Sequence, residues 1–210
     1  MATHNPGYIT SSTVKRLLTG KGDKLLQGGK TFARQIARER FGVEDPNSAF
    51  GGNAATEWGN YHEDEAIAAY EAQHFVSVHS GQVGVADGWL SCLPDGLVGT
   101  NGIAEVKCHF KTDKHMDNLL EDKWVSAYEA QCRFQMMLTG RDWCDLISYD
   151  PRWPEPMNLH SVRLEREDEW EEFCHDRIEQ AEEIIADIIA KLDRAKNITK
   201  KTNTEQKNLF

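Results

Sequence analysis

In residues 93–107, LPDGLVGTNGIAEVK, the strand-like run IAEVK follows a glycine-containing turn. Alternate side chains of a strand leave the same face, so Glu105 and Lys107 would point one way while Val106 points into the core. The Gly-Thr-Asn-Gly between Asp95 and Glu105 fits a hairpin turn, which would bring Asp95, at the end of the preceding strand, to the face of Glu105. The segment therefore predicts two carboxylates and a lysine side by side.

Two carboxylates so placed suit a hard cation such as Mg²⁺, which takes oxygen ligands and keeps several waters. A cation at Asp95 and Glu105 could lower the pKa of a bound water and stabilise charge on a phosphodiester, while Lys107 orients the water or neutralises phosphoryl oxygens. The same residues also fit a turn cap and an exposed Glu105–Lys107 pair worth roughly a few tenths of a kcal/mol. The pattern alone leaves both interpretations open.

On either side of this segment, helical and strand patterns alternate. The expected helices are a short one from Ser11 or Ser12 to the glycines at 20 and 22, then about 30–40, 53–70, 124–138 and 167–192. The expected strands are an antiparallel set after residue 73, and 144–150 and 159–164, which would complete the sheet. This order predicts an α+β fold, an α/β sandwich with a mixed central sheet flanked by helices. We expect one domain over residues 1–196 and a loose polar tail over 197–210.

The composition is that of a globular protein, with 210 residues and 40% hydrophobic content. The sequence has no apolar run near the roughly 18 residues of a membrane span and no signal peptide, so we expect a cytoplasmic protein. Its five cysteines include no CxxC pair, which favours reduced thiols over structural zinc.

The net charge of −10 argues at first against nucleic acid, because phosphate contacts need lysine and arginine. The charge is unevenly distributed, however. Eight basic residues and only two acidic ones lie between Lys15 and Arg40, while the acidic excess lies largely in the last expected helix. The basic segment fits either a DNA contact or a solvated helix face.

Several motifs together resemble a known family. Pro94-Asp95 and Glu105-Val106-Lys107 resemble the PD-(D/E)xK nuclease signature. Upstream, EWGNYHEDEAIAAYE (57–71) resembles a helix of the phage lambda exonuclease or YqaJ-type viral recombinase (alkaline exonuclease) family, in which a glycine is followed four positions later by a glutamate. Here these residues are Gly59 and Glu63.

Downstream, SAYEAQCRFQMMLTG (126–140) is similar to the family's glutamine-bearing helix, and SYDPRW (148–153) is similar to its following strand and turn. The resemblance covers about residues 7–176. Each motif is weak alone, but four in this order at compatible distances are specific. The resemblance implies a restriction-endonuclease-like core in a single nuclease domain.

The resemblance also implies roles for individual residues. Asp95 and Glu105 would be metal ligands together with the carbonyl of Val106, Glu63 would hold a water on the metal, Lys107 would position the nucleophile, and Gln131 would support the site. The expected cofactor is Mg²⁺, with Mn²⁺ as a substitute. Glu63 also fits a solvated acidic patch with its neighbours, and Gln131 also fits a partner for a core backbone group.

The implied activity is a 5′ to 3′ exonuclease that degrades one strand of linear double-stranded DNA and leaves 3′ overhangs for single-strand-annealing recombination. Implied partners are duplex ends, two further copies in a homotrimeric ring, and a phage-type annealing protein. An endonuclease of the same superfamily and an inactive DNA-binding module remain alternatives.

The segment GYITSST (7–13) resembles the family's GxITAS motif, which would line the DNA channel. Ser12, Lys15 and Lys21 are therefore expected DNA contacts. In the family an arginine just ahead of this motif helps bind the 5′ phosphate, but no arginine precedes Lys15 here. Lys111 or Lys114 would take over, or the preference for a 5′ phosphate would be weaker.

Overall fold

The structure, a computed structural model, describes residues 6–20, 22–43, 53–80 and 85–207. Two sheets organise it. The larger has the order β2-β5-β6-β7-β8 (Val78–Ser80, Gly96–Val98, Gly102–Cys108, Trp143–Tyr149, Leu159–Glu165), and the smaller the order β1-β4-β3 (Ile9–Thr10, Leu90–Cys92, Val85–Asp87). Strand β6 is parallel to β7, and the other pairs of the larger sheet are antiparallel, so this sheet is mixed, as expected.

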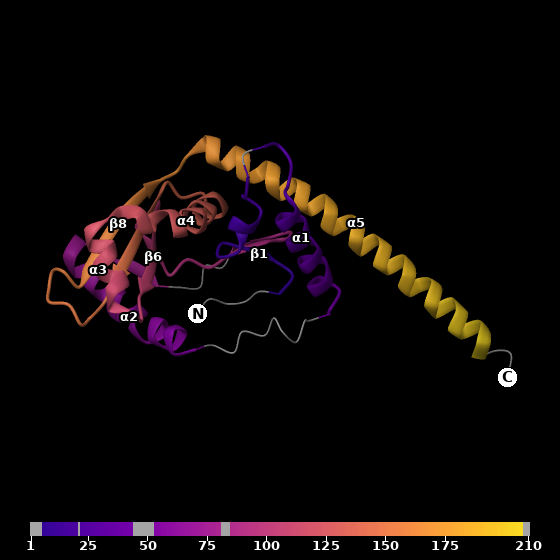
Figure 1. Ribbon diagram of the computed structural model, residues 1–210, viewed down its shortest axis with the longest axis horizontal. Helices are drawn as coiled ribbons and strands as arrows, with labels where there is room; N and C mark the ends of the chain where they lie inside the picture. The colour runs from indigo at the N-terminus through magenta and orange to yellow at the C-terminus, as the bar shows by residue number, and fades with distance from the viewer. Residues whose placement is uncertain (1–5, 21, 44–52, 81–84, 208–210) are drawn as a thin grey trace.

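Five α-helices and two 3₁₀ turns surround the sheets within the described residues. They are η1 (Val14–Arg16), α1 (Gln27–Arg40), α2 (Ala54–His74), α3 (Thr112–Leu120), η3 (Asp122–Trp124), α4 (Val125–Thr139) and α5 (Asp168–Lys207). Figure 1 shows α2, α3 and α4 around the larger sheet, while α5 runs beside α1 and extends beyond it. No helix of the described residues is long and apolar enough to cross a membrane.

Local sequence explains the limits of the helices that carry site residues. The Asn53 side chain accepts hydrogen bonds from the N–H groups of Ala55 and Thr56, which caps the start of α2. Helix α4 ends at Gly140, whose φ of +66° lies in the left-handed region that glycine adopts without steric cost. Both boundaries agree with the sequence expectation to within a residue or two.

Helices α2 and α4 pack on opposite faces of the larger sheet. Ala66 and Ile67 of α2 belong to the same hydrophobic cluster as Val106, whereas Cys132 of α4 clusters with Ile103. Because successive strand residues alternate between faces, β6 presents Val106 to α2 and Glu105 to α4. The expected inward direction of Val106 is confirmed, and the opposite face, which carries Glu105, is also covered by a helix.

Three expectations about the elements were wrong. The short helix from Ser11 or Ser12 is only the 3₁₀ turn η1, because the hydroxyls of Thr10 and Thr13 bond one another and the adjacent backbone in competition with helix formation. The strands after residue 73 pair antiparallel, as expected, but they divide between two sheets, with Pro94 in the crossing segment between β4 and β5.

The third difference concerns helix length and number. Helix α3 was not expected. Its buried residues are the polar His115 and Asn118, whereas its apolar residues Met116 and Leu120 are exposed. Helix α5 stays helical to Lys207, past Asn197 where a loose tail was expected, since each residue added to an existing helix gains a backbone hydrogen bond. The division into a domain over 1–196 and a tail stays a prediction.

Candidate active site

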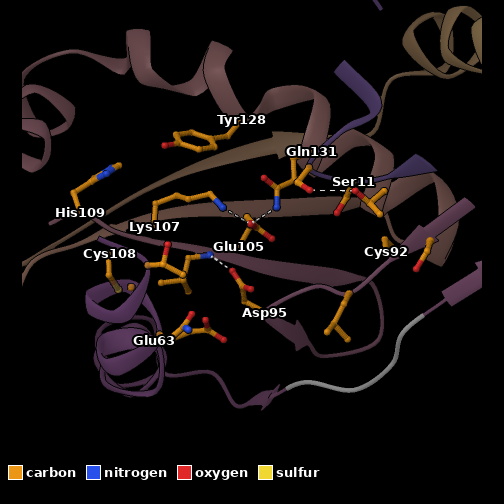
Figure 2. A pocket seen from close by; sticks show the side chains of 18 residues that line it. Ser11, Glu63, Cys92, Asp95, Glu105, Lys107, Cys108, His109, Tyr128 and Gln131 are labelled. Atoms are coloured by element: carbon orange, nitrogen blue, oxygen red, sulfur yellow. Dashed lines mark hydrogen bonds and ion pairs between the residues drawn. The ribbon is translucent and has the colours of Figure 1, made fainter. Parts of the chain in front are cut away.

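An open cavity of about 330 Å³ lies where α2, the start of β5, β6, α4 and the segment after β1 meet. Its volume falls in the range of small-molecule sites. The lining includes five residues to which the sequence assigns chemistry: Glu63, Asp95, Glu105, Lys107 and Gln131. Figure 2 shows them converging on one space from α2, the turn before β5, β6 and α4.

Asp95 reaches this space through the hairpin that the sequence predicts. It lies one residue before β5, which pairs with β6 in the register Gly96↔Ala104, and Gly99 in the turn has a φ of +52°. The N–H of Val106 donates a hydrogen bond to Asp95 Oδ2 at 2.7 Å. This bond fixes the Asp95 carboxylate against β6, beside Glu105.

Glu105 is the most enclosed of these residues, with 1% of its surface exposed. Its Oε1 accepts hydrogen bonds from Lys107 Nζ and Gln131 Nε2, both at 2.5 Å, as the dashed lines in Figure 2 mark. Its Oε2 accepts one from Gln135 Nε2 at 2.8 Å. The pair of Glu105 and Lys107 is therefore not an exposed surface pair, and that alternative is excluded.

Burial and neighbouring like charges make ionisation of the carboxylates in this cluster unfavourable. Burial raises the pKa of Asp95 well above its usual value, and the negative charges of Glu105 and Glu63 raise it further against the opposing effects of Lys107 and the Val106 N–H. Burial alone would lower the pKa of Lys107, but Glu105 and Asp95 together raise it, so Lys107 stays charged. Full ionisation of the carboxylates would thus place more negative charge here than one lysine compensates.

That unbalanced charge, together with an all-oxygen donor set, fits a divalent cation at Asp95 and Glu105. Within the described part of the chain, no three carboxylate, histidine or cysteine side chains are already arranged as a metal site. The protein would therefore supply two carboxylates, and backbone oxygen and water would fill the remaining coordination positions. Mg²⁺ is usually bound in this way, because it retains several waters rather than taking all its ligands from the protein.

Two further groups in the cavity are held in their neutral form. Burial raises the pKa of the Cys108 thiol to about 12, with added effects from Glu63 and Asp95, so the reactive thiolate is scarce at neutral pH. Burial, with the nearby charges of Lys114, His115 and Lys107, lowers the pKa of His109 to about 4. Cys108 as a nucleophile and His109 as an acid therefore fit the site poorly.

The profile of the YqaJ-like viral recombinase domain matches residues 4–142, about two thirds of the chain. The chain belongs to the YqaJ-like viral recombinase family. The family expectation drawn from the motifs is confirmed.

Solved structures agree with this assignment. The crystal structure of an alkaline exonuclease from Laribacter hongkongensis is 26% identical with a TM-score of 0.75, covering 94% of this chain and 95% of that one. The same protein in complex with dAMP gives a TM-score of 0.72 at the same identity and coverage. A phage-related exonuclease from Haemophilus somnus 129PT, 17% identical, has a TM-score of 0.74 over 88% of this chain and 96% of that one, which shows the shared fold. Among curated proteins, none matches.

The DNA contacts expected of this YqaJ-like chain are distributed unevenly. Ser12 lines the cavity beside Ser11 and Thr10. Lys15, Lys111 and Lys114 are exposed but are not among the residues that line it, and Lys21 lies outside the described residues. Lys111 immediately precedes α3, which follows β6 directly, so it lies on the chain next to the site.

Other basic residues of the N-terminal segment have structural partners. The Arg40 guanidinium lies over the ring of Tyr8, with its carbon 3.9 Å from the ring centroid, and donates to the carbonyls of Gly7 and Gly88. Arg16 bonds Gln35. Part of the basic segment therefore fastens the start of the chain to α1 and the smaller sheet.

Sequence reasoning missed two contacts that shape this YqaJ-like site. The hydrogen bond from the Gln135 amide to Glu105 was not foreseen. In the segment 148–153, Arg152 bonds both oxygens of Asp150 and the carbonyls of His109 and Phe110, which anchors the chain just beyond β6. A glutamine at i+4 from a site residue was the one signal available for the first contact.

Proposed function

We propose that this protein is a metal-dependent DNA exonuclease that degrades one strand of linear duplex DNA from its 5′ end and leaves 3′ single-stranded overhangs for annealing-type recombination. The observation that carries the proposal is the cluster of Asp95, Glu105 and Lys107 at one open cavity. Membership in a nuclease family supports the enzyme class.

Asp95, Glu105 and the carbonyl of Val106 would hold the cation, which we propose to be Mg²⁺ with Mn²⁺ as a substitute. When bound, the cation supplies Lewis-acid stabilisation of phosphoryl oxygen charge and activates water at neutral pH. Glu63, from α2 on the far side of the cavity, would hold a water in place for attack.

Lys107 contributes a permanent positive charge aimed at the reacting phosphate. Its Nζ lies 5.0 Å from the centre of the Tyr128 ring and donates a hydrogen bond to Glu105, so its charge is at the cavity before substrate arrives. A charge held in advance loses little freedom when negative charge develops on the phosphate, which is the basis of electrostatic catalysis. The side-chain amide of Gln131 donates a hydrogen bond to Glu105 and would keep that carboxylate in place.

A solved relative supports the exonuclease activity proposed here. The Laribacter hongkongensis protein is an alkaline exonuclease, and its complex with dAMP supports a nucleotide-sized ligand in this fold. We propose that Ser12, Lys15, Lys21, Lys111 and Lys114 contact DNA, that three copies form a ring around it in the cytoplasm, and that an annealing protein receives the single strand. An acidic exterior on such a ring would direct DNA toward the channel.

End-labelled DNA tests the polarity and the end requirement. Linear duplex labelled at the 5′ or the 3′ end, and closed circular duplex, are incubated with the protein and Mg²⁺. The proposal predicts early release of the 5′ label as mononucleotide, late loss of the 3′ label and intact circles. Cutting of circles would favour the endonuclease alternative, and binding without cleavage would leave a DNA-binding module.

The 5′ phosphate should matter less here than in family members that carry an arginine ahead of the GxIT motif. The segment before Gly7 contains no arginine, so this contact is absent or replaced by a lysine. We expect removal of the 5′ phosphate from a linear duplex to slow initial digestion less than it slows such a relative, measured side by side. An equal or greater slowing would contradict this prediction.

DNA affinity should depend steeply on salt despite the net charge of −10. If six or more phosphates are contacted, affinity should fall by about 10³-fold or more between 50 and 200 mM salt, because binding releases condensed counterions. Fluorescence anisotropy of a labelled duplex in the presence of EDTA measures this without cleavage. A flat response would exclude an extended DNA path over basic residues.

A further inference from the structure

The Glu105 carboxylate is held from two directions. Lys107 and Gln131, which both line the cavity, bond Oε1. Gln135, one helical turn after Gln131 on α4, bonds Oε2 but does not line the cavity, and none of its surface is exposed. The two oxygens of one carboxylate therefore have different surroundings, one facing the cavity and one facing the protein interior.

In the orientation that lets the Gln135 side-chain N–H donate to Glu105, the side-chain carbonyl of Gln135 has no hydrogen-bond donor facing it among the described residues. Its Oε1 is buried and has no hydrogen-bond partner within the described residues. Turning the amide over would place that oxygen against Glu105 Oε2, where two acceptors would meet without a proton between them. A buried amide left half-satisfied is unfavourable, and its apolar neighbours in the sequence, Phe134 and Met136, show that this part of α4 is otherwise core. Among the residues that the structure describes, the interaction with Glu105 is therefore the contact that explains a glutamine here.

We propose that Gln135 is a positioning residue that fixes Glu105 through Oε2, so that Oε1 is the oxygen that exchanges between Lys107 and a divalent cation. This inference rests on the proposed function. A carboxylate oxygen has two acceptor positions, and Lys107 and Gln131 occupy both on Oε1. A cation entering from the cavity meets Oε1 first, and Lys107, itself in the cavity wall, is the partner that can move aside toward substrate.

Without the amide of Gln135, the Glu105 carboxylate would turn more freely, because the terminal torsion of a glutamate is broad and roughly two-fold. Its ligating oxygen would then have to be ordered when the cation binds. Loss of a group that orients a metal ligand typically weakens metal affinity by about 10–100-fold. The effect should appear in cation binding and in the metal concentration needed for half-maximal rate, and less in the rate at saturating metal.

The test is calorimetric titration of the metal-free protein with Mn²⁺, for wild type, Gln135→Met and Gln180→Met. Methionine keeps the length of glutamine and removes the amide. Gln180 is the matched control, because its amide bonds the carbonyl of Asp23 and the N–H of Leu25, away from the cavity. Thermal unfolding of all three proteins measures the structural cost of each change separately.

We expect Gln135→Met to bind Mn²⁺ about 10–100-fold more weakly than wild type, and Gln180→Met to bind it as wild type does. Equal affinity in Gln135→Met and wild type would overturn the inference while leaving the proposed function intact. No binding by wild type would overturn both. Should Gln135→Met fail to fold, Gln135→Asn, which keeps the amide but is one methylene too short to reach Glu105, decides by the same criterion.

Discussion

Replacing Lys107 with methionine should abolish most of the nuclease activity while leaving a folded protein. The variant keeps an unbranched side chain but removes the ammonium group that contacts Glu105 and lies over the Tyr128 ring. Loss of one preorganised stabilising group at a reaction centre typically costs about 10²–10³ in kcat. The measurement is the rate of nucleotide release from linear duplex at saturating Mg²⁺.

The matched control for this change is Lys191→Met. Lys191 bonds Asp187 on the exposed part of α5, so its loss removes a lysine ion pair without touching the cavity. We expect its rate to equal that of wild type. A Lys107→Met variant that retained wild-type kcat would exclude a role for this lysine in the chemical step.

Asp95→Asn should have opposite effects on activity and on stability. The change removes a proposed metal ligand, so metal-dependent cleavage should fall by about 10²-fold or more, the range seen when a group acting on the reaction centre is lost. Asparagine keeps an oxygen that can accept the Val106 N–H bond. In the absence of metal, the variant should be at least as stable as wild type.

The expected stability of Asp95→Asn follows from the direction in which the pKa of Asp95 is shifted. Burial and the charges of Glu105 and Glu63 raise the folded-state pKa of Asp95 above its unfolded value. Ionised Asp95 therefore opposes folding at neutral pH, and this unfavourable contribution disappears as the pH falls below the unfolded value. A neutral asparagine removes it at every pH. Thermal unfolding in EDTA at pH 7 measures the difference.

Asp145→Asn serves as the control, because we expect it to lower the stability of the protein. Asp145 is also buried, but its carboxylate accepts two bonds from Arg163 and one from Tyr70. Its charge is compensated, so replacement by asparagine should destabilise the protein. If Asp95→Asn destabilised the metal-free protein as much as Asp145→Asn does, the claim that the ionised Asp95 carboxylate opposes folding would be contradicted.

The local geometry of the site could be predicted from sequence because it depends on neighbours along the chain. The two-residue spacing of Glu105 and Lys107 places both on one face of a strand, and the glycine-containing turn returns Asp95 to the same place. The helical spacing of residues along the chain located the glutamine helix and the α2 helix. These parts rest on short-range rules of strands, turns and helix ends.

What could not be predicted depends on contacts across the fold. Glu105 is enclosed because α4 covers its face of the sheet, and the sequence does not say which helix covers which face. Helix α3 buries His115 against Ser148 and the carbonyl of Met157, so its buried face is polar, whereas a sequence reading relies on the buried face of a helix being apolar. The Gln135 contact needed the same long-range information.

The most direct test of the central claim is the release of acid-soluble nucleotides from uniformly labelled linear duplex DNA, in Mg²⁺ and in EDTA, by wild type and by Asp95→Asn. We expect rapid release by wild type in Mg²⁺, and release near background in EDTA and by Asp95→Asn. Release that continued in EDTA, or that survived the loss of the Asp95 carboxylate, would contradict a metal-dependent exonuclease at this site.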